Sequence, residues 1–363
     1  MSRQKVVVAM SGGVDSSVAA SVLKERGYEV QGMTMEVVPL KNFSLKEEDE
    51  AIPRVGVTEK AQKVARFLNI PHERLNLKKE FEQKVISNFC NEYAQGRTPN
   101  PCIRCNKFIK MGLLMDKALE RGADYLATGH YAQVVYQRDV KRYLLKKGKD
   151  REKDQSYFLY PLNQKQFSFL LMPLGFMTKH QVQKKASQLN LPLKKDTESQ
   201  EICFIPEDNY VGFLKKRRPE SFIPGPVKDL NGNILGFHQG ILHFTIGQRR
   251  GMGISASHPL YVVDIRSEDQ SVVVGTQDQL YKKNFLISSV NMIVQNEIPS
   301  EMEIQARIRY KHEEAPACLK KKNSSQAWVE FKKPQRAITP GQSVVLYRGD
   351  TVLGGGIIEK ALD

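Results

Sequence analysis

The N-terminal segment constrains the fold more than any other part of the chain. Residues 6–8 are three consecutive valines and predict a fully buried strand, and residues 11–17 follow as a loop of Ser, Gly, Val and Asp. Residues 18–26 then show the apolar spacing of a helix. A strand, a glycine-rich loop and a helix in this order point backbone N–H groups at an anion. Because Gly12 and Gly13 allow the backbone to approach such a ligand closely, the segment predicts a phosphate-binding loop.

The loop string Ser-Gly-Gly-Val-Asp-Ser-Ser, residues 11–17, resembles the signature of the N-type ATP pyrophosphatases, or PP-loop family. These enzymes cleave ATP between its α and β phosphates and leave an adenylated substrate and pyrophosphate. The loop contains no lysine, which separates it from the GxxxxGK-type loop that holds β and γ phosphates. The alternative is an ordinary strand-to-helix turn in which Ser16 or Ser17 serves only as a helix cap.

The charge of the chain predicts a polyanionic partner. The 363 residues include 55 Lys and Arg against 40 Asp and Glu, a formal net charge of +15 at pH 7. The excess is concentrated in six short basic clusters between residues 146 and 322, and nucleic acid is the polyanion that such a surface favours. No apolar run approaches the roughly 20 residues of a membrane span, and there is no signal-peptide pattern. We therefore expect a cytoplasmic protein that does not bind a membrane.

Changes in the pattern of apolar and turn residues along the chain predict an α/β fold followed by two smaller domains. The first 130 residues alternate strand and helix patterns, which indicates that residues 1–205 form a domain with a doubly wound parallel sheet that binds ligands at the carboxyl ends of its strands. Residues 206–281 contain short apolar runs separated by Gly, Pro and Asn, and predict a small, mostly β central module. Residues 282–363 alternate short strand patterns with turns, which is typical of a compact C-terminal β-barrel.

The chain has five cysteines, an odd number that disfavours a structural disulfide framework: Cys90, Cys102, Cys105, Cys203 and Cys318. The prolines of residues 96–107 hold the backbone extended and predict a helix that starts after Asn106. A cysteine near that helix N-terminus, beside Arg104 and Lys107, should have a depressed pKa. Cys203, taken alone, is typical of a small buried residue in a strand. Catalysis, sulfur transfer and metal binding all stay open on these patterns.

Longer strings make the resemblance more specific. The sequence resembles, from end to end, the bacterial and mitochondrial tRNA-specific 2-thiouridylases. The PP-loop domain of that family is adenine nucleotide alpha hydrolase-like. The similar strings are AMSGGVDSSVAA, GRTPNPCIRCNKFIK, GADYLATGHYA, KDQSYFLY, SQEICFI, FTIGQRRGMGI and TPGQSVVLYRGDTVLGGGII. Several strings of this length in one order make coincidence implausible.

The resemblance implies a reaction in which the C2 oxygen of the wobble uridine, position 34 of tRNA, is replaced by sulfur. The uridine oxygen attacks the α phosphate of ATP and becomes an adenylate, because a urea-like carbonyl oxygen leaves poorly. Mg²⁺ would compensate the phosphate charge. The implied ATP-binding residues are Ala9, Met10, Ser11, Gly12, Gly13, Val14, Asp15, Ser16, Met35 and Gly129. The products are 2-thiouridine, AMP and pyrophosphate.

The resemblance also assigns the cysteines and the tRNA contacts. Cys203 matches the persulfide carrier, loaded by a separate sulfur donor protein, and Cys105 matches the nucleophile that releases the sulfur or closes a transient disulfide with Cys203. Asn100, Pro101 and Cys102 match the segment that meets the target base. A flipped-out pyrimidine needs edge hydrogen bonds and a stacking partner. Further implied tRNA contacts are His130, Lys153, Asp154, Gln155, Arg309, Tyr310 and Gln342.

Two departures from the family pattern leave alternatives open. Part of the family has Asp, assigned as a general acid or base, where this chain has Cys102. A thiol can take that role, but Cys102, Cys105 and Cys203 could instead hold a [4Fe-4S] cluster. Two further alternatives are a zinc-stabilised RNA-binding protein without catalysis and a PP-loop enzyme that amidates a small molecule. The second departure is Lys60, where the family often has Asp; we expect it on an exposed helix.

Overall fold

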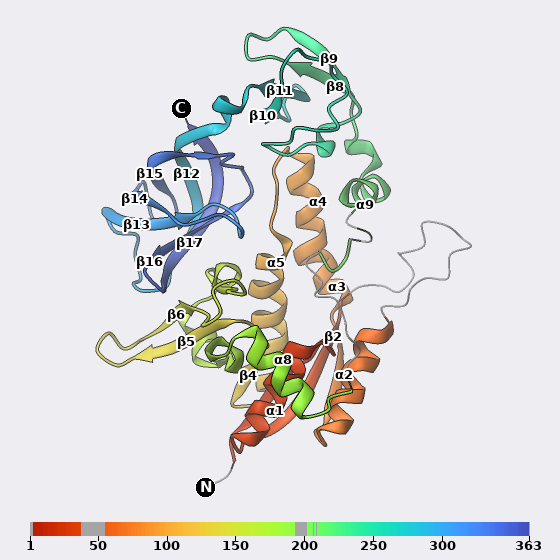
Figure 1. Ribbon diagram of the computed structural model, residues 1–363, viewed down its shortest axis with the longest axis vertical. Coiled ribbons are helices and arrows are strands. Elements are labelled where there is room, and N and C mark those ends of the chain that lie inside the picture. The colour runs from red at the N-terminus through yellow and green to blue at the C-terminus, as the bar shows by residue number, and fades with distance from the viewer. Residues whose placement is uncertain (1–2, 38–54, 193–201, 206, 208, 363) are drawn as a thin grey trace, which may run out of the picture. The chain divides into compact units, whose positions relative to one another are not determined.

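The computed structural model describes residues 3–37, 55–192, 202–205, 207 and 209–362. The chain forms two compact units (Figure 1). The first unit comprises residues 1–85, 102–200 and 350–352, and the second comprises residues 86–101, 201–349 and 353–363. In the described part of the chain, no helix combines the length and the apolar character that a membrane crossing requires.

A parallel five-stranded sheet forms the centre of the first unit. Its strands lie in the order β3-β2-β1-β4-β7. Their bounds are β1 Lys5–Ala9, β2 Glu29–Glu36, β3 His72–Asn76, β4 Tyr125–Ala127 and β7 Leu170–Leu171. All four neighbouring pairs are parallel, so the carboxyl ends of the strands lie at one edge. The predicted parallel α/β sheet is confirmed, and the order, which turns back at β1, gives β1 and β4 as the switch point.

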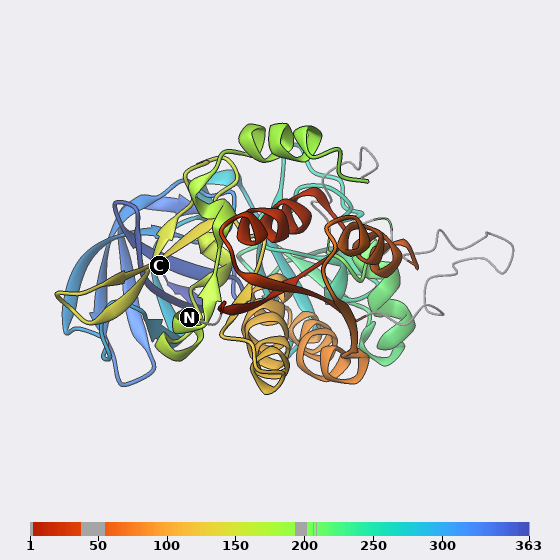
Figure 2. The ribbon, with the colours of Figure 1, turned by 90° about the horizontal axis from the view of Figure 1, so that it is seen from below.

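Helices cover both faces of this sheet, as Figure 2 shows. One face packs against α1 (Val14–Glu25), α2 (Val55–Phe67) and α8 (Lys179–Gln188). Val6 and Val8 join the apolar core on that side, while Val7 points to the other face, and all three are fully buried. A strand buried on both faces explains why β1 is a continuous apolar run.

The other helical segments of the first unit are short. They are α3 Lys78–Phe81, η2 Glu82–Ile86, α5 Pro101–Arg104, η3 Cys105–Leu114, α6 Met115–Glu120, η4 Ser156–Leu159, α7 Gln164–Ser168 and η5 Pro173–Phe176. A hairpin of β5 (Ala132–Gln137) and β6 (Arg142–Lys147) also belongs to this unit, and Thr351 and Val352 pair with β6. The helices η2 and η3 are π-helical.

The second unit holds a small sheet and a barrel. The small sheet has the order β10-β11-β8-β9. Six strands form the barrel, which closes where β12 pairs with β17, and its interior includes Phe285, Leu319 and Phe331. The predicted C-terminal β-barrel is therefore confirmed, whereas the domain boundaries after residues 205 and 281 stay predictions. The elements are α4 Ser87–Ala94, α9 Tyr210–Arg217, η7 Pro219–Ser221, β8 Gly225–Lys228, β9 Ile234–His238, η8 Ile241–His243, β10 Tyr261–Arg266, β11 Ser271–Gly275, η9 Gln277–Leu280, β12 Tyr281–Met292, β13 Glu301–Arg307, β14 Ala315–Lys321, β15 Ala327–Arg336, β16 Ser343–Arg348 and β17 Thr351–Leu362.

Candidate functional site

The loop between β1 and α1 has the conformation that its glycines and serines predict. Gly12 has φ +73°, and a Cβ there would lie 2.5 Å from the Cβ of Lys60, so only glycine fits. The Ser16 hydroxyl accepts a hydrogen bond from the Ser11 N–H and donates to the Gly13 carbonyl, both at 3.2 Å. Side-chain hydroxyls therefore hold the loop in shape at the N-terminus of α1, where an anion is stabilised.

Lys60 lies against this loop, which corrects the expectation of an exposed position. Its side chain is half-buried, and its Cβ is next to the place where a Cβ on Gly12 would lie. The helix α2 packs against β2 and so carries Lys60 to the carboxyl edge of the sheet. The expectation failed because periodicity within a helix does not show which residue meets a loop from another part of the chain.

The carboxyl end of β4 meets the same loop. A Cβ on Gly129 would lie 2.9 Å from both the Asp15 carbonyl carbon and the Ser16 nitrogen, so the two backbones touch. Met35 lies half-buried near the end of β2, the strand on the other side of β1. These residues come from three adjacent parallel strands and the turns after them, which is where such sheets bind ligands.

Asp15 is the centre of a charged group in which Lys179 was not anticipated from the sequence. The Nζ atom of Lys179 donates to both carboxylate oxygens of Asp15 at 2.8 Å, and the Tyr131 hydroxyl donates to Oδ1 at 2.7 Å. The Lys179 ammonium also lies 5.7 Å from the centre of the Tyr131 ring. The side chains of Lys179 and Asp15 are 17% and 31% exposed, so the pair is accessible to a ligand.

A helix-start signal could have located Lys179. Thr178 caps α8 and forms a capping box with Gln181, so the string Thr-Lys-His-Gln marks the first turn of the helix that follows β7. A lysine in the first turn is unfavourable for the helix dipole. In the fold, Asp15 compensates that charge from 164 residues away. The sequence pattern showed the start of the helix but not its partner.

His130 follows Gly129 and lies in a poorly solvated position. Burial lowers the pKa of its imidazole well below the ordinary value, and the positive charge of Lys110 lowers it further. Its Nδ1 atom lies 2.8 Å from the Thr128 hydroxyl. His130 is therefore neutral near pH 7 and offers a hydrogen bond to an uncharged group such as a base edge.

One helical run carries both cysteines of the Cys-x-x-Cys segment. It begins with α5 at Pro101 and continues through η3 and α6 to Glu120. The prediction of a helix that starts only after Asn106 is wrong, because proline fits the first helical position, where its missing N–H costs nothing. Cys102 thus lies in the first turn, and Cys105 lies where the π-helical part begins. Such irregular turns recur at functional sites.

The thiol of Cys102, in the first turn of this helical run, has a raised pKa. Its side chain is exposed, but desolvation by the surrounding protein raises the pKa of the thiol, and Lys110 lowers it by a smaller amount. Cys105 is half-buried, and its lowered pKa stays a prediction. Cys102 is therefore a thiol near pH 7, a form that can donate a proton.

In the segment Lys153–Gln155, backbone N–H groups of the first unit hold two side chains by hydrogen bonds. Asp154 is buried, and its Oδ1 atom accepts from the N–H groups of Gly148 and Ser156 at 3.0 and 3.1 Å. Gln155 pairs with the backbone of Tyr131, whose N–H donates to Oε1 at 3.0 Å. These contacts hold the side chains of Asp154 and Gln155 in place, while Lys153 is half-buried. Direct tRNA contacts by the three residues stay a prediction.

In the second unit, the segment that precedes α5 is held to the barrel domain by hydrogen bonds and an ion pair. Thr98 donates its N–H to the Pro340 carbonyl at 2.9 Å, and the side-chain amide of Gln342 donates to the Thr98 carbonyl at 2.9 Å. Arg97 forms ion pairs with Glu92 and Glu359 at 2.7 and 2.8 Å.

Gln342, predicted to contact tRNA, thus holds the residues that lead to Asn100 and Pro101. Asn100 is half-buried and Pro101 is buried. Arg309 donates to the Arg336 carbonyl at 3.0 Å, and Tyr310 follows it, half-buried, after the end of β13. Their contacts with tRNA stay predictions.

Cys203 lies in a turn and is exposed, so its interpretation as a small buried strand residue is wrong. Its neighbours Phe204 and Ile205 are buried instead, and Phe204 packs edge-on against Phe89. The aromatic contact anchors the turn and leaves the thiol outside. Among the described residues, no three His, Cys, Asp or Glu side chains are grouped to hold a metal ion.

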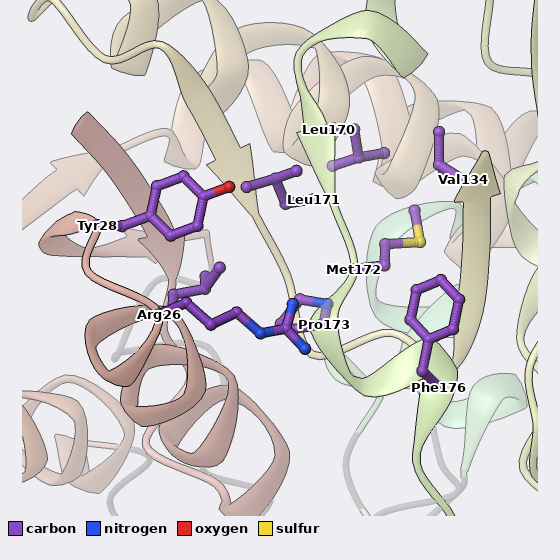
Figure 3. Close-up of a pocket in the computed structure, with 9 residues that line it drawn as sticks. Arg26, Tyr28, Val134, Leu170, Leu171, Met172, Pro173 and Phe176 are labelled. Atoms are coloured by element: carbon purple, nitrogen blue, oxygen red, sulfur yellow. The ribbon is translucent and has the colours of Figure 1, made fainter. Parts of the chain in front are cut away.

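A separate pocket in the first unit lies between the end of α1 and β7 (Figure 3). Its lining is mainly apolar, with Arg26 and Tyr28 at one side and Phe176 at the other. No residue predicted for the nucleotide or tRNA sites lines it. The pocket therefore adds nothing to the assignment of the loop.

The parallel sheet, the loop at its switch point and the barrel define a class of protein: a PP-loop nucleotide-binding enzyme with C-terminal β domains. Family comparison agrees, since the tRNA methyl transferase HUP domain matches residues 4–207, the tRNA methyl transferase PRC-barrel domain residues 211–276, and the aminomethyltransferase beta-barrel domain residues 282–358.

Individual relatives make the assignment specific. The tRNA-specific 2-thiouridylase MnmA of Carboxydothermus hydrogenoformans is 49% identical over 360 residues, which cover 99% of each chain. The tRNA-specific 2-thiouridylase MnmA 2 of Thermoanaerobacter sp. (strain X514) is 48% identical over 358 residues, 99% of this chain and 98% of that one. The chain belongs to the tRNA-specific 2-thiouridylase family. Among solved structures, a predicted tRNA methyltransferase subunit from Methanocaldococcus jannaschii covers 60% of this chain and 91% of its own, with 20% identity and a TM-score of 0.34, too low to bear on function.

Proposed function

We propose that the protein is a tRNA-uridine 2-sulfurtransferase that replaces the C2 oxygen of the wobble uridine, position 34, by sulfur and consumes ATP. The full-length similarity to tRNA-specific 2-thiouridylases carries this proposal. The contact of Gly129 with the Asp15–Ser16 backbone supports it, because it brings the end of β4 to the segment that carries the family signature. The enzyme would act in the cytoplasm on tRNA and receive sulfur from a persulfide donor protein.

The first step is activation of the uridine. Residues 9–16 would hold the phosphates of ATP with backbone N–H groups and hydroxyls, and Met35 and Gly129 would lie against the adenosine. The uridine O2 atom attacks the α phosphate, pyrophosphate leaves, and the adenylated oxygen becomes a good leaving group. Lys179 would turn from Asp15 to the phosphates and stabilise the charge that grows on the pyrophosphate oxygens.

The residues present fit a magnesium ion bound together with ATP. Mg²⁺ is usually held by one or two carboxylates and by substrate phosphates, and Asp15 is the carboxylate of the loop. The ion would supply charge compensation on the phosphates. Asp15 is partly exposed, and its carboxylate already accepts hydrogen bonds from an ammonium group and a hydroxyl group. A carboxylate in such surroundings is suited to a magnesium ion.

The second step is delivery of sulfur by the cysteines. The terminal sulfur of a Cys203 persulfide attacks C2, the Cys105 thiolate attacks the Cys203 sulfur atom, and AMP leaves with the original oxygen. The sulfur stays on the uridine, and a Cys105–Cys203 disulfide remains for cellular thiols to reduce. The exposure of Cys203 supports loading by a donor protein, and the protonated thiol of Cys102 would protonate the departing group.

The persulfide route and a [4Fe-4S] cluster on Cys102, Cys105 and Cys203 both require Cys203 to meet the Cys-x-x-Cys segment. The persulfide route is the one that we propose, and no step is derived through a cluster. Iron and acid-labile sulfide analysis of protein purified without air tests this alternative directly.

Incubation with ATP and unmodified tRNA tests the function. We expect pyrophosphate release that depends on tRNA and, with a persulfide donor, 2-thiouridine in the digested tRNA. The Ser16→Ala variant removes a hydroxyl that shapes the loop and should release little pyrophosphate while it still binds tRNA. Wild-type protein that releases no pyrophosphate with tRNA, or that releases it equally without tRNA, would contradict the proposal.

A further inference from the structure

Three cationic side chains of the first unit surround the ring of Phe108. The Nζ atoms of Lys84 and Lys107 lie 5.7 and 5.3 Å from the ring centre, and the Cζ atom of Arg104 lies at 5.0 Å. Lys84 belongs to η2, whereas Arg104, Lys107 and Phe108 belong to the run of α5 and η3. Two separate helical segments therefore bring their positive charges to one aromatic ring.

The arrangement is held by more than the ring. The Nε atom of Arg104 donates to the Lys84 carbonyl at 2.9 Å, which fixes the guanidinium beside the second segment. Lys84 is exposed, and Arg104, Lys107 and Phe108 are half-buried, so the group lies at the surface and is open to solvent. Burial lowers the pKa of Lys107, and the neighbouring charge of Arg104 lowers it further. The positive charges therefore repel one another, and a bound anion would relieve that repulsion.

We propose that Lys84, Arg104 and Lys107, arranged around Phe108, form a binding site for a phosphate group of the tRNA backbone next to Cys105. This proposal rests on the proposed function. A guanidinium presents paired N–H donors that match phosphate oxygens, and flanking ammonium groups add charge. An aromatic ring among cations is the combination that single-stranded nucleic acids contact, because bases stack on the ring while phosphates meet the charges.

The position of this site on the helix connects it with the chemistry. Phe108 follows Cys105 by three residues, so both lie within one turn of the π-helical segment η3. A loop of RNA whose backbone is held at Phe108 is thereby kept near the cysteine. The alternative occupant, an acidic surface of the sulfur donor protein, has no stacking requirement, so the phenyl ring distinguishes between the two.

Charge removal with a matched control tests the proposal. The double variant Lys84→Gln/Lys107→Gln should bind unmodified tRNA about tenfold or more weakly at 0.1 M salt. The plot of log K against log salt, which falls with salt, should also become less steep by roughly 0.7 to 1.8, because one or two phosphate contacts are lost. Lys117→Gln removes one positive charge from the same helical run, where Lys117 pairs with Glu120 at 2.7 Å, and should leave the slope unchanged. Phe108→Leu should weaken binding without changing the slope.

The outcomes separate the proposal from its rivals and from the proposed function. Wild-type tRNA affinity and slope in the double variant would overturn the phosphate site. If that variant keeps its tRNA affinity but is no longer loaded with sulfur by the donor protein, the surface binds protein and the proposal is wrong. Failure of the proposed function would appear instead in the wild type, as tRNA that stimulates no pyrophosphate release. Retention of ATP-dependent stabilisation in each variant excludes unfolding as the cause.

Discussion

Replacement of Lys179 by alanine should separate catalysis from stability at the nucleotide site. In the free protein, Lys179 donates to both oxygens of Asp15, while Tyr131 donates to one of them. The Lys179→Ala variant therefore leaves Asp15 with its hydroxyl partner. Both charged side chains are partly solvated, at 17% and 31% exposure, so we expect a loss of unfolding free energy of only about 1 kcal/mol.

The catalytic loss should be larger. A positioned cationic donor that meets charge developing in the transition state contributes about 3 kcal/mol, which corresponds to a factor of about 10² in rate. Lys179→Ala should therefore lower kcat/KM for ATP by about 100-fold or more in the tRNA-dependent pyrophosphate assay. The affinity for tRNA should change little, because one charge is removed from a chain with a net charge of +15.

Lys185 provides a matched control on the same helix. Its Nζ atom pairs with Glu25 at 2.6 Å, so it also links α8 to α1, but at the end of α1 away from the loop. Lys185→Ala should cost a similar amount of stability, measured by denaturant midpoint, and leave the pyrophosphate rate within about threefold of the wild type. If Lys179→Ala retains near-normal kcat/KM, or if both variants lose activity equally, the assigned role of Lys179 is refuted.

Three other predictions concern the cysteines, the barrel and acid stability. Cys203→Ser and Cys105→Ser should each abolish 2-thiouridine but retain tRNA-dependent pyrophosphate release. Cys102→Asp should stay active and free of iron. A wild type that contains iron, and a Cys102→Asp variant that has lost both the iron and the activity, would contradict the persulfide route. Arg309→Ala should weaken tRNA binding and reduce its salt slope by roughly 0.7 to 0.9, and an unchanged slope would exclude a phosphate contact there. Burial lowers the pKa of His130, so its contribution to stability is complete above the unfolded value of 6.5 and is lost as pH falls below that value. The His130→Gln variant should therefore lose less stability than the wild type between pH 7 and 5 in urea titrations, and a parallel decline would rule out this linkage.

Local chemistry was enough to predict the conformation of the loop between β1 and α1 and the two β-rich regions. The three valines of β1, the positive-φ Gly12 and the serine hydroxyls act within a dozen residues, so their pattern is readable without the fold. The barrel was predictable for the same reason, because alternating strands and turns are short-range features. The early start of α5 at Pro101 shows the limit of such reasoning, since proline is compatible with both an extended segment and the first turn of a helix.

Only the tertiary structure decided which distant residues meet. Lys179 lies 164 residues from Asp15, and Gln342 lies 244 residues from Thr98, yet both pairs are hydrogen-bonded. The ring of cations at Phe108 is another case, because Lys84 and Arg104 come from different helical segments. Sequence periodicity reports the environment of one face of one element. It carries no information on which face of another element packs against it, because that choice depends on the packing of the whole core.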